Sequence, residues 1–147
     1  MKKILYFLII TLIISCKQKE QTEDMIELNT PVLKTKTVDK IILKNFTYED
    51  ISRYAIASIM GQSAKIIKVT KKDEIYILSY IRKSDKQKFD YKMKVEGNKI
   101  LWANLDGRWR NSEYDEKITF IEKENNINII QTFEDNSQDI QEFIKGD

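Results

Sequence analysis

The chain has 147 residues, with 25 lysines and arginines against 23 aspartates and glutamates, so its formal net charge is only +2. It contains no histidine and a single cysteine, and so lacks both the commonest general base and the thiols that a disulfide within the chain would need. The near balance of charge argues against bulk electrostatic binding of nucleic acid, and we expect no nucleic-acid partner.

The first fifteen residues have the pattern of a targeting segment. Lys2 and Lys3 precede an apolar stretch, residues 4–14, which ends at Ser15 and Cys16. A secretory apolar region is about 7–15 residues long, whereas a membrane-spanning helix needs about 20. The sequence therefore predicts an export signal that ends beside the cysteine.

The residues Ile13-Ile14-Ser15-Cys16 resemble the lipobox of bacterial lipoproteins: an aliphatic residue, a permissive residue, a small residue and cysteine. In that family the cysteine sulfur carries diacylglycerol, and cleavage before the cysteine frees an amine that is acylated. The resemblance implies that residues 1–15 are a signal peptide and that Cys16 is the lipidated first residue of an envelope protein. The alternative is an ordinary signal peptide or membrane anchor with an incidental cysteine.

The residue after the cysteine bears on the choice of membrane. In the enteric sorting rule an aspartate there retains a lipoprotein at the inner membrane, but Lys17 occupies this position. For a host with two membranes, the resemblance therefore implies the outer membrane, facing the periplasm or the surface. Residues 16–38 are polar and without a sustained period, and they contain the single proline, Pro31. We expect a flexible tether there.

Residues 39–147 are expected to form one α+β domain. Residues 39–46 read as a short strand or a strap. A helix is predicted from Thr47, an N-cap with Asp50 three residues on, to Gly61, a plausible C′ residue. Ile56 and Met60 lie opposite the main apolar face of this helix, so either it is covered on both sides or it exposes a small apolar patch.

The rest of the domain alternates between apolar and polar residues with a period of two. Residues 89–97 are the clearest example and indicate a half-buried antiparallel strand. Similar runs occupy 64–70, 74–82, 99–105, 116–123, 127–133 and 139–144, the last being a strand or a short helix. We expect an N-terminal helix packed on an antiparallel meander of six to seven strands, as a curved sheet or a partial barrel.

Residues 102–116 form the most distinctive stretch. Asp106-Gly107 is a hairpin signal, and Trp102, Arg108, Trp109 and Arg110 flank it. These four residues are candidates for binding, because tryptophan and arginine dominate interface hot spots. Alternatively, both indoles pack in the core and the arginines pair with Asp115, Glu116 or neighbouring strands. Strand alternation favours exposed arginines and a largely buried Trp109.

No catalytic residue, metal ligand or cofactor site is predicted. No motif for a phosphate cradle or an activated serine occurs, and the spacing of the carboxylates selects no catalytic pair. We expect a non-enzymatic envelope lipoprotein that is held in the membrane by its lipid and binds a protein partner or assists envelope assembly. The alternatives are an immunity or surface-exclusion lipoprotein and a domain that interacts with glycan or peptidoglycan.

Overall fold

The computed structural model of the protein describes residues 41–147. The predicted signal peptide (1–15), Cys16 and the tether (16–38) lie outside the described residues. The elements follow one another as α1 (Tyr48–Met60), the 3₁₀ turn η1 (Ala64–Ile66), β1 (Lys68–Lys72), β2 (Ile75–Ile81), β3 (Lys88–Glu96), β4 (Lys99–Asn104), β5 (Lys117–Lys123), β6 (Asn126–Thr132) and β7 (Gln138–Ile144).

Helix α1 begins and ends at the residues that the sequence indicates. The Thr47 hydroxyl accepts the amide of Asp50 at 3.1 Å, and the Asp50 carboxylate accepts the amide of Thr47 at 3.0 Å. This reciprocal pair satisfies two of the amides that a helix N-terminus leaves without partners. At the other end Gly61 has a φ of 59°, a left-handed conformation that glycine adopts without a Cβ clash. Both predicted helix ends are confirmed.

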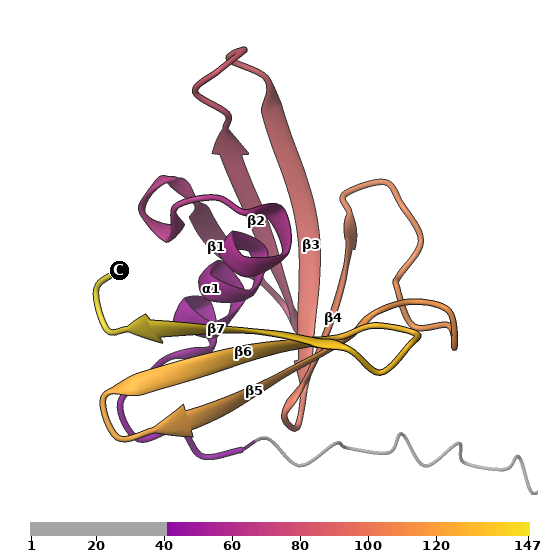
Figure 1. The fold of residues 1–147 in the computed structure, drawn as a ribbon. Helices are drawn as coiled ribbons and strands as arrows, with labels where there is room; N and C mark the ends of the chain where they lie inside the picture. Colours follow the sequence, from indigo (N-terminus) through magenta and orange to yellow (C-terminus); the bar gives the residue numbers. More distant parts are fainter. Residues whose placement is uncertain (1–40) are drawn as a thin grey trace, which may run out of the picture. The chain divides into compact units, whose positions relative to one another are not determined.

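The seven strands form one open antiparallel sheet in the order β1-β2-β3-β4-β5-β6-β7. Each strand pairs with its neighbour in the sequence, and no described strand joins β1 to β7. Strands β4 and β5 pair only at Lys99 with Thr119 and at Ile100 with Ile118. The sheet consequently has two wings, β1–β4 and β5–β7, which cross at a steep angle in Figure 1.

Helix α1 packs against the inner face of both wings. It contacts β1, β2 and β3 on one side and β6 on the other. Ile56 is fully buried and Met60 is half-buried, where it accepts a contact from the Tyr91 hydroxyl at 3.3 Å. Of the two alternatives for this helix, coverage on both sides is therefore the one observed.

The predicted antiparallel meander is confirmed, with one local difference at residues 64–67, and the two segments whose form the sequence left open each take one of their predicted forms. Residues 41–46 form a strap without strand pairing. The strand predicted at 64–70 begins only at Lys68, because residues 64–66 turn as η1. The last apolar run is the strand β7 and not a helix. Within the described residues, one helix with a seven-stranded antiparallel sheet makes the fold broadly α+β.

Candidate functional site

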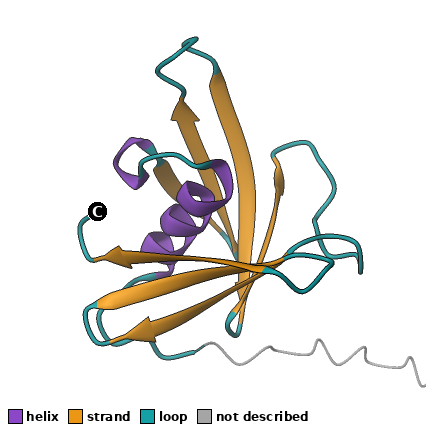
Figure 2. Ribbon diagram, viewed as in Figure 1, coloured by secondary structure: helices purple, strands orange, loops and turns teal. Residues whose placement is uncertain are grey.

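The segment with the four predicted binding residues is a long loop between β4 and β5, residues 105–116, shown in teal in Figure 2. The amide of Gly107 donates to the carbonyl of Asn104 at 2.9 Å, and the amide of Arg110 donates to the carbonyl of Trp102 at 3.0 Å. The predicted turn is present. The prediction that residues 108–110 continue as a regular strand was wrong, because β5 begins only at Lys117.

Arg108 closes the loop on Asp115. Its guanidinium nitrogens donate to the two carboxylate oxygens of Asp115 at 2.7 and 2.8 Å. The same carboxylate accepts the hydroxyl and the amide of Ser112 at 2.6 and 2.9 Å. The Arg108 guanidinium and the Ser112 donors hold the pKa of Asp115 well below its usual range. The exposed Arg108 is therefore already engaged in a bidentate pair within the loop.

Arg110 and Trp102 meet at a second carboxylate. The Trp102 indole is 3% exposed, and its Nε1 donates to Glu116 at 3.1 Å. The Arg110 guanidinium lies 4.3 Å from the centroid of the Trp102 ring and 3.5 Å from the other Glu116 oxygen. A cation over an indole and beside a carboxylate is stabilised by both. The structure thus agrees with the alternative in which Arg108 and Arg110 pair with Asp115 and Glu116.

The ring of Trp109 lies by the face of the sheet that points away from α1, although its backbone carbonyl accepts the Arg108 guanidinium at 3.1 Å. The ammonium groups of Lys92 and Lys94 lie 5.3 and 5.6 Å from the centroid of its ring. These lysines alternate on β3 with the buried Tyr91 and Met93, so they belong to the outer face. Trp109 is half-buried there and is not part of the buried core cluster. The structure brings Arg110 and Trp102 together at Glu116 and pairs Arg108 with Asp115, whereas the Trp109 ring lies on the outer face beside lysines of β3.

A cavity of about 250 Å³ opens where β4 and β5 diverge. Its floor is apolar, and Arg110, Asp115, Glu116, Lys99 and Lys117 line it. Its lining carries groups of both charges, and the carboxylates of Asp115 and Glu116 already accept hydrogen bonds. Within residues 41–147, no cluster of acidic side chains is suited to hold a metal ion.

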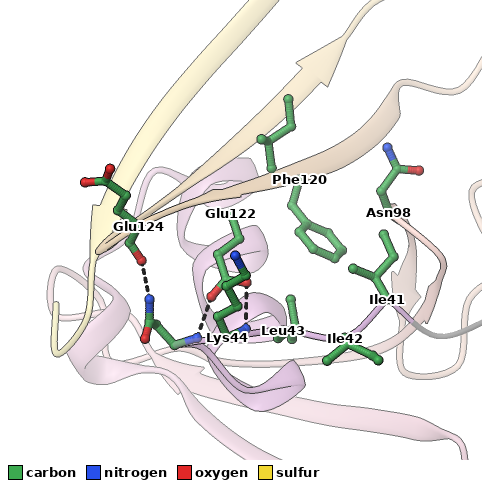
Figure 3. A pocket seen from close by; sticks show the side chains of 10 residues that line it. Ile41, Ile42, Leu43, Lys44, Asn98, Phe120, Glu122 and Glu124 are labelled. Atoms are coloured by element: carbon green, nitrogen blue, oxygen red, sulfur yellow. Dashed lines mark hydrogen bonds between the residues drawn. The ribbon is translucent and has the colours of Figure 1, made fainter.

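A larger cavity of about 420 Å³ lies beside the strap, lined by apolar side chains that include Ile42, Phe120 and Ile121 (Figure 3). Glu122 holds the strap beside it, because its carboxylate accepts the amides of Lys44, Asn45 and Phe46 at 2.9, 2.7 and 3.2 Å.

Burial by itself would raise the pKa of Glu122. The three donated amides outweigh this effect and leave the pKa of Glu122 below its ordinary value. The carboxylate is therefore saturated with donors and serves to fix the strap.

The outer face of β5–β7 is unusually rich in isoleucine. Ile130 of β6 lies directly between Thr119 of β5 and Ile140 of β7 in the strand register, and Ile121 and Ile144 point to the same side. Ile121, Ile140 and Ile144 are 46%, 54% and 54% exposed. We call Ile121, Ile130, Ile140 and Ile144 the isoleucine face. Sequence reasoning missed it, although isoleucines at both even and odd positions of residues 127–130 signal a strand that is apolar on both faces.

No helix among the described residues has the length and apolar character needed to cross a membrane. Comparisons of the chain with protein-family models, curated proteins and solved structures found no match.

Proposed function

We propose that the protein is a non-enzymatic, lipid-anchored lipoprotein of the cell envelope whose domain of residues 39–147 binds a protein partner through the isoleucine face. The anchor rests on the lipobox-like residues Ile13-Ile14-Ser15-Cys16. The partner surface rests on one observation: Ile130 and Ile140 are cross-strand neighbours on the outer face of β6 and β7, and the exposed Ile121 and Ile144 lie on the same face. A contiguous exposed apolar patch is the usual mark of an interaction surface.

The polar loop at residues 105–116 supports this choice indirectly. Its arginines are paired with Asp115 and Glu116, which leaves them little capacity for a new carboxylate or phosphate. The Trp102 ring is buried and has Arg110 beside it, so it offers no face on which a sugar could stack. The isoleucine face, in contrast, gains apolar burial when a partner covers it, at about 25 cal/mol per Å².

The role of an envelope assembly factor and that of an immunity or surface-exclusion protein would use the same face. They differ in the partner, which is a resident envelope protein in the first role and an incoming protein in the second. Identification of the bound partner therefore separates them.

The partner surface is tested by a photo-crosslinking residue at Ile121 of the full chain in the native envelope. The matched control carries the same group at Ile81, which is 56% exposed and lies at the end of β2 in the other wing. We expect capture of a defined protein from position 121 and not from position 81, and loss of the capture from position 121 when Ile130→Glu, on the same face, is added. Equal capture from both positions would contradict the proposal.

The anchor is tested separately by labelling with a fatty acid. Cys16→Ala should abolish acyl labelling and leave an unprocessed precursor, whereas Cys16→Ala that still incorporates label would exclude lipidation at this residue. For a host with two membranes, Lys17 leads us to propose the outer membrane, and recovery in the inner-membrane fraction alone would count against it.

A further inference from the structure

Strand β7 presents a row of outward-facing backbone groups at the edge of the sheet. In an antiparallel pair, alternate residues point their N–H and C=O groups toward the neighbouring strand and away from it. The amide of Phe133 donates to the carbonyl of Ser137 at 3.0 Å, which places the groups of Ser137, and of every second residue after it, toward β6. The groups of Gln138, Ile140 and Glu142 consequently point to the free edge.

The C-terminal end of β7 independently shows the same alternation of backbone groups that point toward β6 and away from it. The carbonyl of Ile144 accepts the Tyr54 hydroxyl at 3.1 Å, and the amide of Ile144 donates to the Asp147 carboxylate at 2.8 Å. Both groups of Ile144 thus point away from β6 and are already bonded. Within the described residues, no hydrogen bond reaches the backbone groups of Gln138, Ile140 and Glu142 on this edge.

The two edges of the sheet differ in how they are protected. Strand β1 carries Lys68, Lys71 and Lys72, and lysines on an edge strand oppose pairing with another chain. Strand β7 has neither lysine nor proline, and its central outer side chain is the exposed Ile140. Of the two edges of the sheet, β7 is therefore the less protected.

We infer that this edge pairs with the β7 edge of a second copy of the chain, antiparallel and centred on Ile140. In that register Ile140 lies opposite its own counterpart, Gln138 lies opposite Glu142, and Asp139 lies opposite Gln141. Gln138, Ile140 and Glu142 each face a residue whose backbone groups also point to the free edge. The three pairs together form about six backbone hydrogen bonds. No two like charges lie opposite each other.

The neighbouring registers are less favourable. Centring on Glu142 places the two Glu142 carboxylates opposite each other, and like charges in direct opposition destabilise a strand pair. Centring on Gln141 sets Gln138 against Ile144, whose backbone groups are already occupied by Tyr54 and Asp147. The self-complementary register is therefore the one centred on Ile140.

The same pairing joins the isoleucine faces of the two copies. Ile130 is the cross-strand neighbour of Ile140. Across the two-fold axis the row therefore runs Ile130, Ile140, then Ile140 and Ile130 of the second copy, all on the outer face. This inference concerns the state of assembly and does not depend on the proposed partner.

The test is the mass of the full chain in detergent micelles, measured by sedimentation across a wide range of protein concentration. Ile140→Pro removes an N–H that points to the free edge and not to β6, and proline is tolerated at such positions. We expect a dimer for the wild-type chain and a folded monomer for Ile140→Pro, with folding checked by circular dichroism. A wild-type chain that stays monomeric at the highest concentration, or a dimeric Ile140→Pro, would overturn the inference.

A second variant covers the event that Ile140→Pro does not fold. Ile140→Arg keeps the backbone unchanged but sets two guanidinium groups against each other, so it too should be monomeric, whereas Ile81→Arg on the other wing should remain a dimer. The register is tested by oxidation: Ile140→Cys should form a covalent dimer, because opposed residues lie about 5.5 Å apart, within the range of a disulfide. Ile81→Cys serves as the matched control, and equal crosslinking of both would refute the register.

Discussion

Tyr54 of α1 stacks on Phe143 of β7, with ring centroids 4.7 Å apart and planes 12° from parallel. The Tyr54 hydroxyl also donates to the carbonyl of Ile144. This contact docks the last strand on the helix. We expect Phe143→Ala to lower the free energy of unfolding by about 2–4 kcal/mol, because it removes a large half-buried ring. Ile144→Ala, at an exposed position of the same strand, should cost less than about 0.5 kcal/mol. Urea denaturation measures both, and equal losses would contradict the assignment.

Glu122 makes stability depend on pH. A carboxylate whose pKa is lowered by folding stabilises the fold above its unfolded pKa, and this stabilisation is lost as the pH falls through the folded pKa. The pKa of Glu122 lies below its ordinary value of 4.5. We therefore expect the melting temperature of the wild-type chain to be constant from neutral pH to about pH 5 and to fall below it.

Glu122→Gln should be less stable than wild type at neutral pH, by about 1–3 kcal/mol, because the charge on the acceptor of three amides is lost. The difference between the two should shrink in acid. Glu124→Gln is the matched control, since Glu124 contacts Asn45 through its backbone carbonyl. Identical melting curves of wild type and Glu122→Gln at neutral pH would show that the strap is held by other contacts.

The pair of Arg108 and Asp115 is expected to keep the 105–116 loop closed. Arg108→Ala leaves the low-pKa carboxylate of Asp115 without its guanidinium, and Asp115→Asn removes the charge from the other side. Both variants should be cut faster by protease within the loop, with little further effect in the double variant, because the two residues act as a unit. Arg82→Ala breaks a similar pair with Asp85 in another loop and should leave cleavage at 105–116 unchanged. Additive effects of the two changes would argue against a coupled pair.

The two tryptophans should differ strongly in their contribution to stability. Trp102 is buried and hydrogen-bonded to Glu116, so Trp102→Ala should cost about 3–5 kcal/mol. Trp109 is half-buried on the outer face, and Trp109→Ala should cost roughly a third of that. Acrylamide should quench the fluorescence of Trp102→Phe, which retains Trp109, more than that of Trp109→Phe. The reverse order of quenching would place the indoles the other way round.

Much of the fold could be predicted because its signals are local. The capping pair Thr47 and Asp50 is three residues apart, and the alternation of residues 89–97 depends only on the strand being half-buried. The candidate site was harder to predict than the fold, because its geometry depends on where β4 and β5 separate. Asp106-Gly107 has the chemistry of a tight hairpin, but the chain returns to the sheet only at Lys117. The local sequence pattern does not indicate how many residues separate this turn from the next strand.

The isoleucine face illustrates a second limit. Alternation assigns side chains to two faces of a strand, but it does not say which strands are neighbours. Ile121, Ile130 and Ile140 come from three separate runs, and only the register between those runs places them on one surface. The sequence analysis included Asp115 and Glu116 among the possible partners of Arg108 and Arg110. Strand alternation could not identify these pairs, because residues 108–110 do not form a strand.

The connectivity of the sheet has a consequence for the order in which the protein folds. Every ladder joins strands that are adjacent in the sequence, and all of them except β4–β5, whose loop is long, close a short loop at small entropic cost. In contrast, the hydrogen bonds from Gln131 to Ser58 and from Tyr54 to Ile144 span 73 and 90 residues. We expect the hairpins to form early and the docking of α1 on the second wing to limit the rate. Gln131→Ala should then slow folding, as stopped-flow kinetics can measure, whereas faster unfolding with an unchanged folding rate would show that this contact forms after the rate-limiting step.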